Sequence, residues 1–224
     1  MYNFDIVKTH KPQSTFRVEK IAADFDINTN EIQEHFIGHI ETPTDWKIGV
    51  IVGGSGTGKT TIARELFKDT LKDKYEYKAQ SVIDDMPSAS IEEITKTFYA
   101  VGFGSVPSWL KPYSVLSNGE KMRVDLARAM LSNTMIVFDE FTSVVDRNVA
   151  RTGCIAISKA IKNSNKQFVA ISCHYDILDW LSPDWVLDTN EMKSFFGKSR
   201  ESRKDIKSND ALAASGISLK DIII

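Results

Sequence analysis

Long hydrophobic runs are missing from this sequence of 224 residues. No apolar stretch approaches the roughly 18 residues that a membrane-spanning helix needs, and residues 1–5 lack the apolar core of a signal peptide. The sequence therefore predicts a cytoplasmic protein with no membrane insertion.

Cysteine is scarce, since the sequence has only Cys154 and Cys173. Their spacing does not fit a metal site, and two thiols in a chain of this size indicate a reducing compartment rather than a disulfide framework. We expect both to be small buried side chains.

An excess of charge of one sign is also missing. The formal net charge is −2 and the isoelectric point is about 6.1, so the field of the whole molecule does not attract nucleic acid or anionic membranes. Any contact with a nucleic acid must be local. With 42% hydrophobic and 26% charged residues, the composition is that of a globular protein able to bury a substantial core.

The strongest signal that is present is the glycine-rich stretch GGSGTGKT at residues 53–60, which fits the pattern G-x-x-x-x-G-K-[ST]. It follows the apolar run 48–52, which predicts a buried parallel strand, and precedes residues 61–67, whose spacing predicts a helix. Backbone N–H groups and the helix N-terminus can hold phosphates, Lys59 can neutralise phosphate oxygens, and the Thr60 hydroxyl can ligate Mg²⁺. A purely structural turn would explain the glycines but not Lys59-Thr60 at that offset. The predicted phosphate-binding residues are Gly53, Gly54, Ser55, Gly56, Thr57, Gly58, Lys59, Thr60 and Thr61.

Residues 1–45 alternate apolar and polar positions, for example at 16–19 and 36–40, and predict a small antiparallel sheet ahead of the core. An aromatic side chain from this segment could stack on an adenine ring. The candidates are Phe16, Phe25 and Phe36, with a core position as the alternative for each. Three histidines of the segment are interpreted as surface or core residues rather than metal ligands: His10, His35 and His39.

The segment after the first helix predicts a strand at residues 75–83 and then a helix at 90–101. Ser90 and Glu93 have the spacing of a capping box, in which the side chains of the two residues bond to the backbone N–H groups of each other. Two prolines break residues 105–113, which we expect to be a short, exposed connection.

The motif LSNGE at residues 116–120 opens a strongly periodic helix at 121–131. One interpretation is a second capping box, with Ser117 as the N-cap and Glu120 three residues later. Asn118 and Gly119 also leave backbone N–H groups uncovered at a helix N-terminus. The motif is therefore a candidate for a second anion site.

Polar residues follow two further predicted strands. Asp139 and Glu140 come directly after residues 134–138, and His174 comes shortly after residues 167–172. Ligands of parallel α/β sheets lie at the carboxyl ends of the strands, so we expect these side chains beside the phosphate loop. Asp139 suits Mg²⁺ and Glu140 suits activation of a water molecule. A core position is the alternative for His174.

Five motifs follow one another along the chain: the phosphate loop, LSNGE with Arg123 behind it, FDE at 138–140, SVVD at 143–146, and His174. In this order they resemble the ATP-binding cassette (ABC) ATPases, over about residues 45–190. DEF at 139–141 followed by Asp146-Arg147, and LSPD at 181–184, are similar to a soluble branch in which such an ATPase is often fused to an acetyltransferase-like domain.

The resemblance implies an α/β fold of the P-loop NTPase type, with a mostly parallel core sheet, an N-terminal antiparallel β subdomain and a small helical subdomain at about residues 85–132. It implies an ATPase domain over residues 1–197, ATP and Mg²⁺ as cofactors, and a head-to-tail homodimer formed on ATP binding. Ser117, Asn118 and Gly119 of one subunit would meet the γ-phosphate held by Lys59 of the other.

The resemblance also implies Glu140 as the general base, His174 as the sensor of the γ-phosphate, and Asp146 in the loop that couples the two sites. Asn118 stands where the family usually has glycine; asparagine tolerates a left-handed backbone better than most residues. The family's glutamine loop has no clean match, because Gln80 lies inside the predicted strand. Asp84 or Asp85 occupies the turn where a coupling residue would sit.

The C-terminal part predicts a strand at 185–187, a polar linker at 198–207 and an apolar end at 217–224 that we expect to dock on this subunit or a partner. The leading functional hypothesis is an ATPase that drives or times a conformational change in a soluble protein partner. The alternatives are an ATP-binding subunit of a membrane transporter, and an ATP-dependent switch in nucleic-acid repair, modification or defence. The short segment between the phosphate loop and LSNGE argues against the transporter.

Overall fold

The computed structural model describes residues 1–27, 32–68, 70–71 and 75–196. The predicted polar linker and apolar C-terminal end, within residues 198–224, lie outside the described residues. In the described part of the chain, no helix is both long and apolar enough to cross a bilayer.

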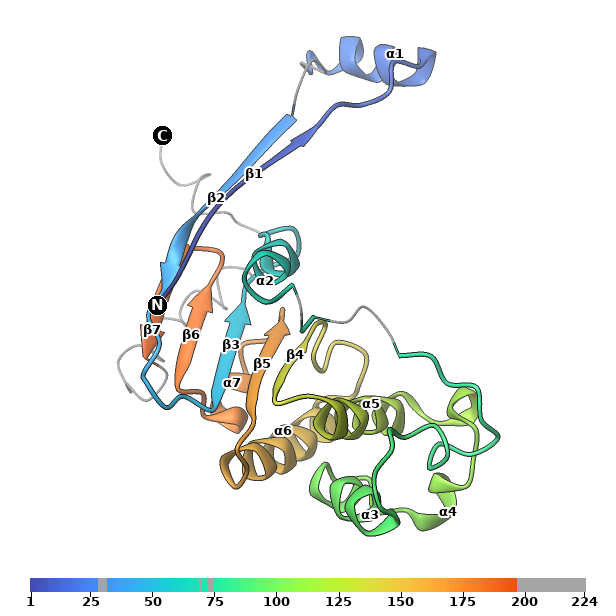
Figure 1. Ribbon diagram of the computed structural model, residues 1–224. Coiled ribbons are helices and arrows are strands. Elements are labelled where there is room, and N and C mark those ends of the chain that lie inside the picture. Colours follow the sequence, from blue (N-terminus) through green and yellow to red (C-terminus); the bar gives the residue numbers. More distant parts are fainter. Residues whose placement is uncertain (28–31, 69, 72–74, 197–224) are drawn as a thin grey trace.

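A five-stranded sheet with the order β4-β5-β3-β6-β7 forms the centre of the molecule (Figure 1). The first four strands of that order are parallel, and β7 runs antiparallel to β6. The mostly parallel core sheet is thus confirmed. Its strands are β3 (Ile48–Val52), β4 (Met135–Phe138), β5 (Gln167–Ser172), β6 (Trp185–Asp188) and β7 (Lys193–Phe196).

Both faces of the sheet are covered, which explains why β3 is apolar and buried at every position. Ile48, Val50 and Val52 point toward the helices on one face: α5 (Asn118–Ser132), α6 (Arg147–Lys162) and α7 (Ile177–Leu181). Ile51 points to the other face, where it packs with α2 (Lys59–Phe67) and with Trp46 and Trp185. The two faces therefore belong to two separate hydrophobic clusters.

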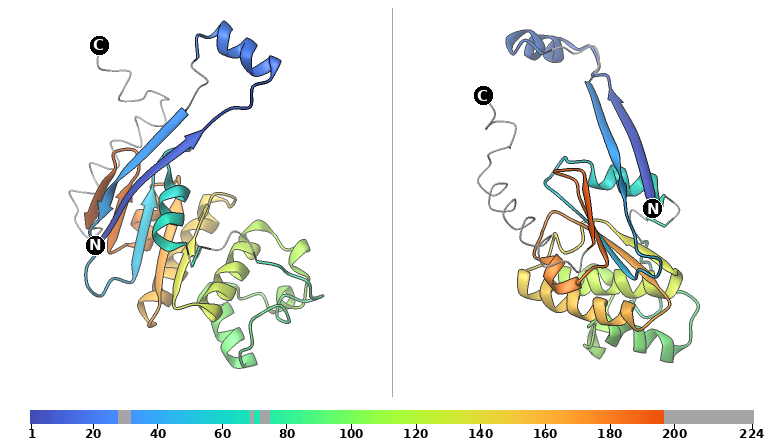
Figure 2. Two further views of the ribbon diagram at one scale, coloured as in Figure 1. Left: turned by 45° about the horizontal axis from the view of Figure 1, so that its top comes forward. Right: turned by 90° about the vertical axis from the view of Figure 1, so that its left-hand side faces the viewer.

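The N-terminal residues form a separate two-stranded sheet. Its strands β1 (Tyr2–His10) and β2 (Ile32–Ile40) pair antiparallel, which confirms the predicted antiparallel sheet. The base of this hairpin packs on α2 through Phe4, Phe36 and Ile40. Its far end projects beyond the rest of the molecule and carries α1 (Phe16–Asp24) (Figures 1 and 2).

The strand-like interpretation of residues 16–19 was wrong, because these residues begin α1. Thr15 caps the helix, since its hydroxyl accepts the Val18 N–H at 3.3 Å. The apolar positions Val18, Ile21, Ala22 and Phe25 repeat with helical spacing, which the short alternating stretch had concealed. No residue of α1 is buried.

The helical part next to α5 consists of α3 (Ile91–Ala100), the short α4 (Val106–Trp109) and a 3-10 turn, η1 (Tyr113–Val115). The capping box of Ser90 and Glu93 at the start of α3 is confirmed. The expectation of an exposed connection at 105–113 was wrong in part. Ser108 and Trp109 are buried, and the Trp109 indole donates to the Phe103 carbonyl at 2.8 Å.

The predicted strand at residues 75–83 is absent, and this described stretch forms an irregular loop with turns. The Asp85 carboxylate accepts the backbone N–H groups of Lys78 and Ala79, at 2.9 and 3.1 Å. The N–H groups of Val82 and Ile83 bond to the connection at 105–113 instead of to a strand. These local partners replace the ladder that a strand would need.

Candidate nucleotide-binding site

The loop between β3 and α2 requires glycine at two positions. Gly58 has a φ of +87°, and a Cβ there would lie 2.4 Å from the ring of Phe36. Gly53 has a φ of +154°, and a Cβ there would lie 2.1 Å from the hydroxyl of Thr189. The loop therefore packs closely against β2 and the end of β6.

The centre of the loop is open. A Cβ at Gly56 would meet no atom within 4 Å, and Ser55 is exposed. Lys59 begins α2, is only 9% exposed, and its ammonium donates to the Gly54 carbonyl at 2.6 Å. This fold of the lysine back over the loop places a positive charge beside the N-terminus of α2, where Thr60 and Thr61 also lie. The arrangement fits a phosphate group.

Parallel pairing brings three of the predicted polar turns to one edge of the sheet. The phosphate loop follows β3, His174 follows β5, and Asp139 and Glu140 follow β4. β5 lies between β3 and β4, so the His174 turn lies between the loop and the carboxylates. The prediction that these residues meet at the carboxyl edge is consistent with this topology.

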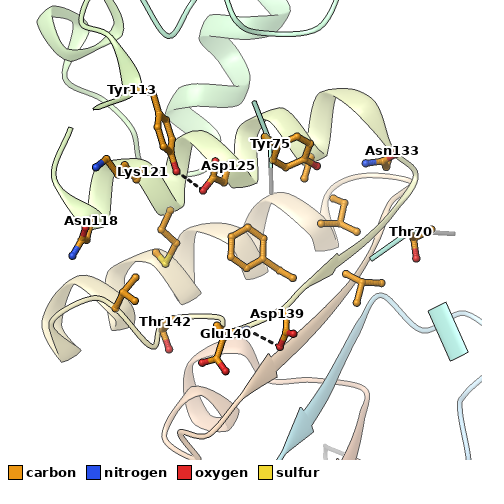
Figure 3. Close-up of a pocket in the computed structure, with 16 residues that line it drawn as sticks. Thr70, Tyr75, Tyr113, Asn118, Lys121, Asp125, Asn133, Asp139, Glu140 and Thr142 are labelled. Carbon is orange, nitrogen blue, oxygen red and sulfur yellow. Dashed lines mark hydrogen bonds between the residues drawn. The ribbon is translucent and has the colours of Figure 1, made fainter. Parts of the chain in front are cut away.

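Asp139 and Glu140 form a sharp turn. Glu140 has a φ of +52°, and its N–H donates to the Asp139 carboxylate at 2.9 Å. The Glu140 side chain is exposed. It faces a cavity of about 450 Å³ between β4 and α5, whose other lining residues include Asn118, Lys121 and Tyr113 (Figure 3). A water molecule therefore has room beside this carboxylate.

Ser117, Asn118 and Gly119 lie at the start of α5, and the capping box of Ser117 with Glu120 is confirmed. The Glu120 N–H donates to the Ser117 hydroxyl at 3.3 Å, and the Ser117 N–H donates to the Glu120 carboxylate at 3.0 Å. Hydrogen bonds from the Ser108 hydroxyl and the Ser117 N–H lower the pKa of Glu120. Ser117 and Asn118 are exposed.

Asp146 is the N-cap of α6, and its carboxylate accepts the Asn148 N–H at 2.8 Å. The next residue, Arg147, forms a two-pronged ion pair with Asp176, of which the Nε to Oδ2 contact is 2.9 Å. Arg147 thus ties the loop after Glu140 to the turn after His174.

The structure brings only one of the three aromatic candidates to the loop. Phe36 packs against Gly58 and is 8% exposed, so its ring serves the core. Phe16 and Phe25 are 81% and 71% exposed at the far end of the hairpin, well away from β3 and α2 (Figure 1). The expectation for the cysteines was wrong for Cys173, which is exposed just before His174, while Cys154 is buried in α6.

Sequence reasoning missed a group of polar residues that is hydrogen-bonded to the loop. Tyr175, Asp188 and Asn190 bond to one another, and the Asn190 side chain accepts the Gly54 N–H at 3.0 Å. Burial raises the pKa of the Asp188 carboxyl group. Asp188 and Asn190 stand at the carboxyl end of β6, beside β3, so the rule that selected His174 and Asp139 could have found them.

Residues considered for a glutamine loop serve the local structure. Gln80 is exposed, Asp84 accepts the Ser81 hydroxyl, and Asp85 holds the backbone of the irregular loop. Among the described residues, none of the three forms a hydrogen bond with the phosphate loop.

No protein-family model matches the chain. Two curated relatives, the mitochondrial iron-sulfur clusters transporters ABCB7 of Oryzias latipes and Danio rerio, are each 25% identical to it. The alignments cover 58% of this chain and 23% of each relative. The chain therefore matches less than a quarter of the length of these relatives.

The solved structures that are similar in fold include two of MJ0796, a bacterial ABC transporter cassette. A dimeric structure of it is 14% identical, with a TM-score of 0.55, and the match covers 74% of this chain and 93% of that one. A dimeric post-hydrolysis state bound to ADP and Pi is 12% identical, with a TM-score of 0.60 and coverage of 88% and 98%. The chain described here therefore has the ATP-binding cassette fold, an α/β P-loop fold with a mostly parallel core sheet and an N-terminal antiparallel sheet.

Proposed function

We propose that this chain is an ABC-type ATPase, which binds Mg-ATP and hydrolyses it. The observation that carries this proposal is the convergence of Lys59, the Asp139-Glu140 pair and His174 at one edge of three neighbouring parallel strands. The proposed ATPase domain spans residues 1–197, with a helical subdomain at about 85–132.

In this proposal residues 53–61 hold the phosphates through backbone N–H groups and the Lys59 ammonium. Thr60 and Asp139 hold Mg²⁺, which neutralises charge on the phosphate oxygens. Glu140 takes the proton of the attacking water, for which its exposed carboxylate and the adjacent cavity leave room. His174 contacts the γ-phosphate from the turn between them.

We propose further that the active form is a head-to-tail homodimer. Ser117, Asn118 and Gly119 of one subunit would donate hydrogen bonds to the γ-phosphate held by Lys59 of the other, and Asp146 would couple the two sites. The exposure of Ser117 and Asn118 at the start of α5 supports this, because a second molecule can reach both residues from the solvent. The dimeric structures of MJ0796 support the same assembly by analogy.

ATP turnover should act on a partner. We favour a soluble protein partner in the cytoplasm, as in the branch fused to acetyltransferase-like domains, with a nucleic acid as another partner. The exposed apolar side chains of α1 at the tip of the hairpin, including Phe16 and Ile21, support a partner protein. The likeness to ABCB7 supports the second candidate at least as well, an ATP-binding subunit of a membrane transporter.

The test of hydrolysis is Glu140→Gln. The amide is nearly isosteric but cannot take a proton, so steady-state ATP hydrolysis should fall by about a hundred- to ten-thousand-fold while ATP affinity is kept. Glu65→Gln, the same change at an exposed site on α2, should leave turnover unchanged. Near-wild-type hydrolysis by Glu140→Gln would move the general base elsewhere, with His174 as the next candidate.

The partner is identified with the same variant. Glu140→Gln protein purified from cells with ATP should retain whatever the ATP-bound state binds. Recovery in the membrane fraction with a multispanning protein would favour the transporter subunit. Stimulation of the wild-type ATPase by DNA or RNA would favour the nucleic-acid partner.

A further inference from the structure

We infer that Tyr175 and Asn190 are positioning residues, which couple the turn that carries His174 to the phosphate loop. This inference rests on the proposed function, because it assigns His174 to the γ-phosphate. Neither residue belongs to a motif of the sequence, and the structure joins both to the phosphate loop through Gly54.

A continuous chain of hydrogen bonds joins the two parts. The Gly54 N–H donates to the Asn190 Oδ1 at 3.0 Å, and the Asn190 Nδ2 donates to the Tyr175 hydroxyl at 2.8 Å. The Tyr175 hydroxyl donates in turn to the Asp188 carboxylate at 3.0 Å. Since Tyr175 directly follows His174, a displacement of the His174 turn moves an anchor of the phosphate loop.

The direction of every bond in this chain is fixed by its first member. A backbone N–H can only donate, so the Gly54 N–H requires the oxygen of the Asn190 amide. The Asn190 NH₂ group then faces Tyr175, whose oxygen must accept from it. The Tyr175 proton is therefore left for the Asp188 carboxylate. No member can reverse without breaking a neighbouring bond, so the link behaves as one unit.

The anchor at the far end of the chain is rigid. Asp188 is 1% exposed and Tyr175 is 4% exposed. Asp188 pairs with Val52 across β6 and β3, and its carboxylate also accepts the Asn190 N–H at 2.9 Å. The next residue, Thr189, donates its N–H to the Val52 carbonyl at 2.8 Å, directly before the phosphate loop. The phosphate loop and the network are therefore both held by the paired ends of β3 and β6.

The test compares the affinities of the purified full-length protein for Mg-ATP and Mg-ADP. His174 contacts only the γ-phosphate in the proposed function, so loss of the link should reduce the preference for ATP over ADP. We expect Asn190→Ala to lower this preference by roughly two- to tenfold, the range for one lost hydrogen bond. Tyr175→Phe should lower it by a similar factor.

A double-mutant cycle distinguishes coupling between the His174 turn and the phosphate loop from a role of Asn190 in supporting the loop alone. In a His174→Ala background, Asn190→Ala should have no further effect on the ATP preference, since the coupled contact is already gone. Tyr77→Phe is the matched control for Tyr175→Phe, because the Tyr77 hydroxyl also donates to a carboxylate, that of the half-buried Asp125, at 2.6 Å. It should leave the preference unchanged.

The outcomes distinguish this inference from the proposed function. Equal losses of ATP and ADP affinity in Asn190→Ala would overturn the coupling and leave the ATPase standing. Additive effects of His174→Ala and Asn190→Ala would do the same. A wild-type protein that binds neither nucleotide would overturn both. Asn190 is exposed, so its alanine variant should fold even where Tyr175→Phe does not.

Discussion

Lys59 carries the charge on which phosphate binding at this loop depends. Its ammonium contacts the Gly54 carbonyl, an acceptor that phosphate oxygens can replace at little cost. Lys59→Ala should therefore abolish tight ATP binding while the fold survives, because β3 and α2 pack through other side chains. Titration with a fluorescent ATP analogue measures the loss, and circular dichroism checks the fold.

Lys68→Ala is the matched control for this prediction. Lys68 is an exposed lysine at the opposite end of the same helix, so its loss should leave nucleotide affinity unchanged. If folded Lys59→Ala protein bound ATP as tightly as the wild type, the assignment of residues 53–60 to phosphate binding would be refuted.

Single residues were predictable where a motif fixes their neighbours. The phosphate loop and the capping boxes of Ser90 and Ser117 depend on spacing within a few residues, and spacing is visible in the sequence. The network of Tyr175 and Asn190 depends on a contact between Asn190 and Gly54, which are 136 positions apart. Nothing in the local sequence specifies such a contact, although the polar end of β6 marks its place.

Elements were predictable where burial dictates the pattern. The strands β3, β4, β5 and β6 are short apolar runs because both faces of the sheet are covered. The segment 75–83 has the composition of a strand, but hydrogen bonds to Asp85 and to the connection at 105–113 satisfy its backbone first. The strand β7 is exposed at its two ends, Lys193 and Phe196, and was not predicted.

The hairpin β1–β2 has a buried base and an exposed end. Three phenylalanines allow the contribution of each to stability to be measured. Phe36 belongs to the cluster beneath the base, whereas Phe16 and Phe25 are 81% and 71% exposed at the tip. Phe36→Ala should lower the free energy of unfolding by about 3 to 5 kcal/mol. Phe16→Ala and Phe25→Ala should change it by less than about 0.5 kcal/mol.

Chemical denaturation of the three variants measures these differences under the same conditions. The three variants make the same change at one buried and two exposed positions, so the difference between them reports the contribution of burial. A loss in Phe16→Ala as large as that in Phe36→Ala would mean that α1 packs against the protein, contrary to the exposed arrangement of Figure 2.

At the scale of the whole molecule, the order of strands was not predictable from the sequence, because it depends on pairings between residues more than 100 positions apart, such as Val50 with Ala170 and with Val186. The edge of the sheet at which the candidate site lies was nevertheless predictable. Parallel strands place their carboxyl ends at one edge in any order, so the loop, His174 and Glu140 were expected together without the topology.

The candidate site also predicts how two copies of the molecule assemble. A γ-phosphate held by Lys59 still has acceptor oxygens, and the exposed start of α5 presents the backbone N–H groups of Asn118 and Gly119, together with a Ser117 hydroxyl that could exchange its bond to Glu120 for one to the phosphate. Mg-ATP should therefore convert Glu140→Gln protein into a compact dimer with two nucleotides at the interface. ADP, which lacks the γ-phosphate, should not hold this dimer.

Ser117→Arg in the Glu140→Gln background should prevent the dimer without weakening ATP binding by the monomer, because arginine fills the proposed contact. It also removes a helix cap, which costs about 1 kcal/mol. Ser90→Arg removes the corresponding cap from the capping box of α3 and separates the two effects, since it should leave the dimer intact.

Size-exclusion chromatography with light scattering gives the mass in each case. Equal masses of Glu140→Gln protein with ATP, with ADP and without nucleotide would exclude ATP-driven dimerisation, and cross-linking between position 117 and the phosphate loop would then decide whether a permanent dimer has the same geometry.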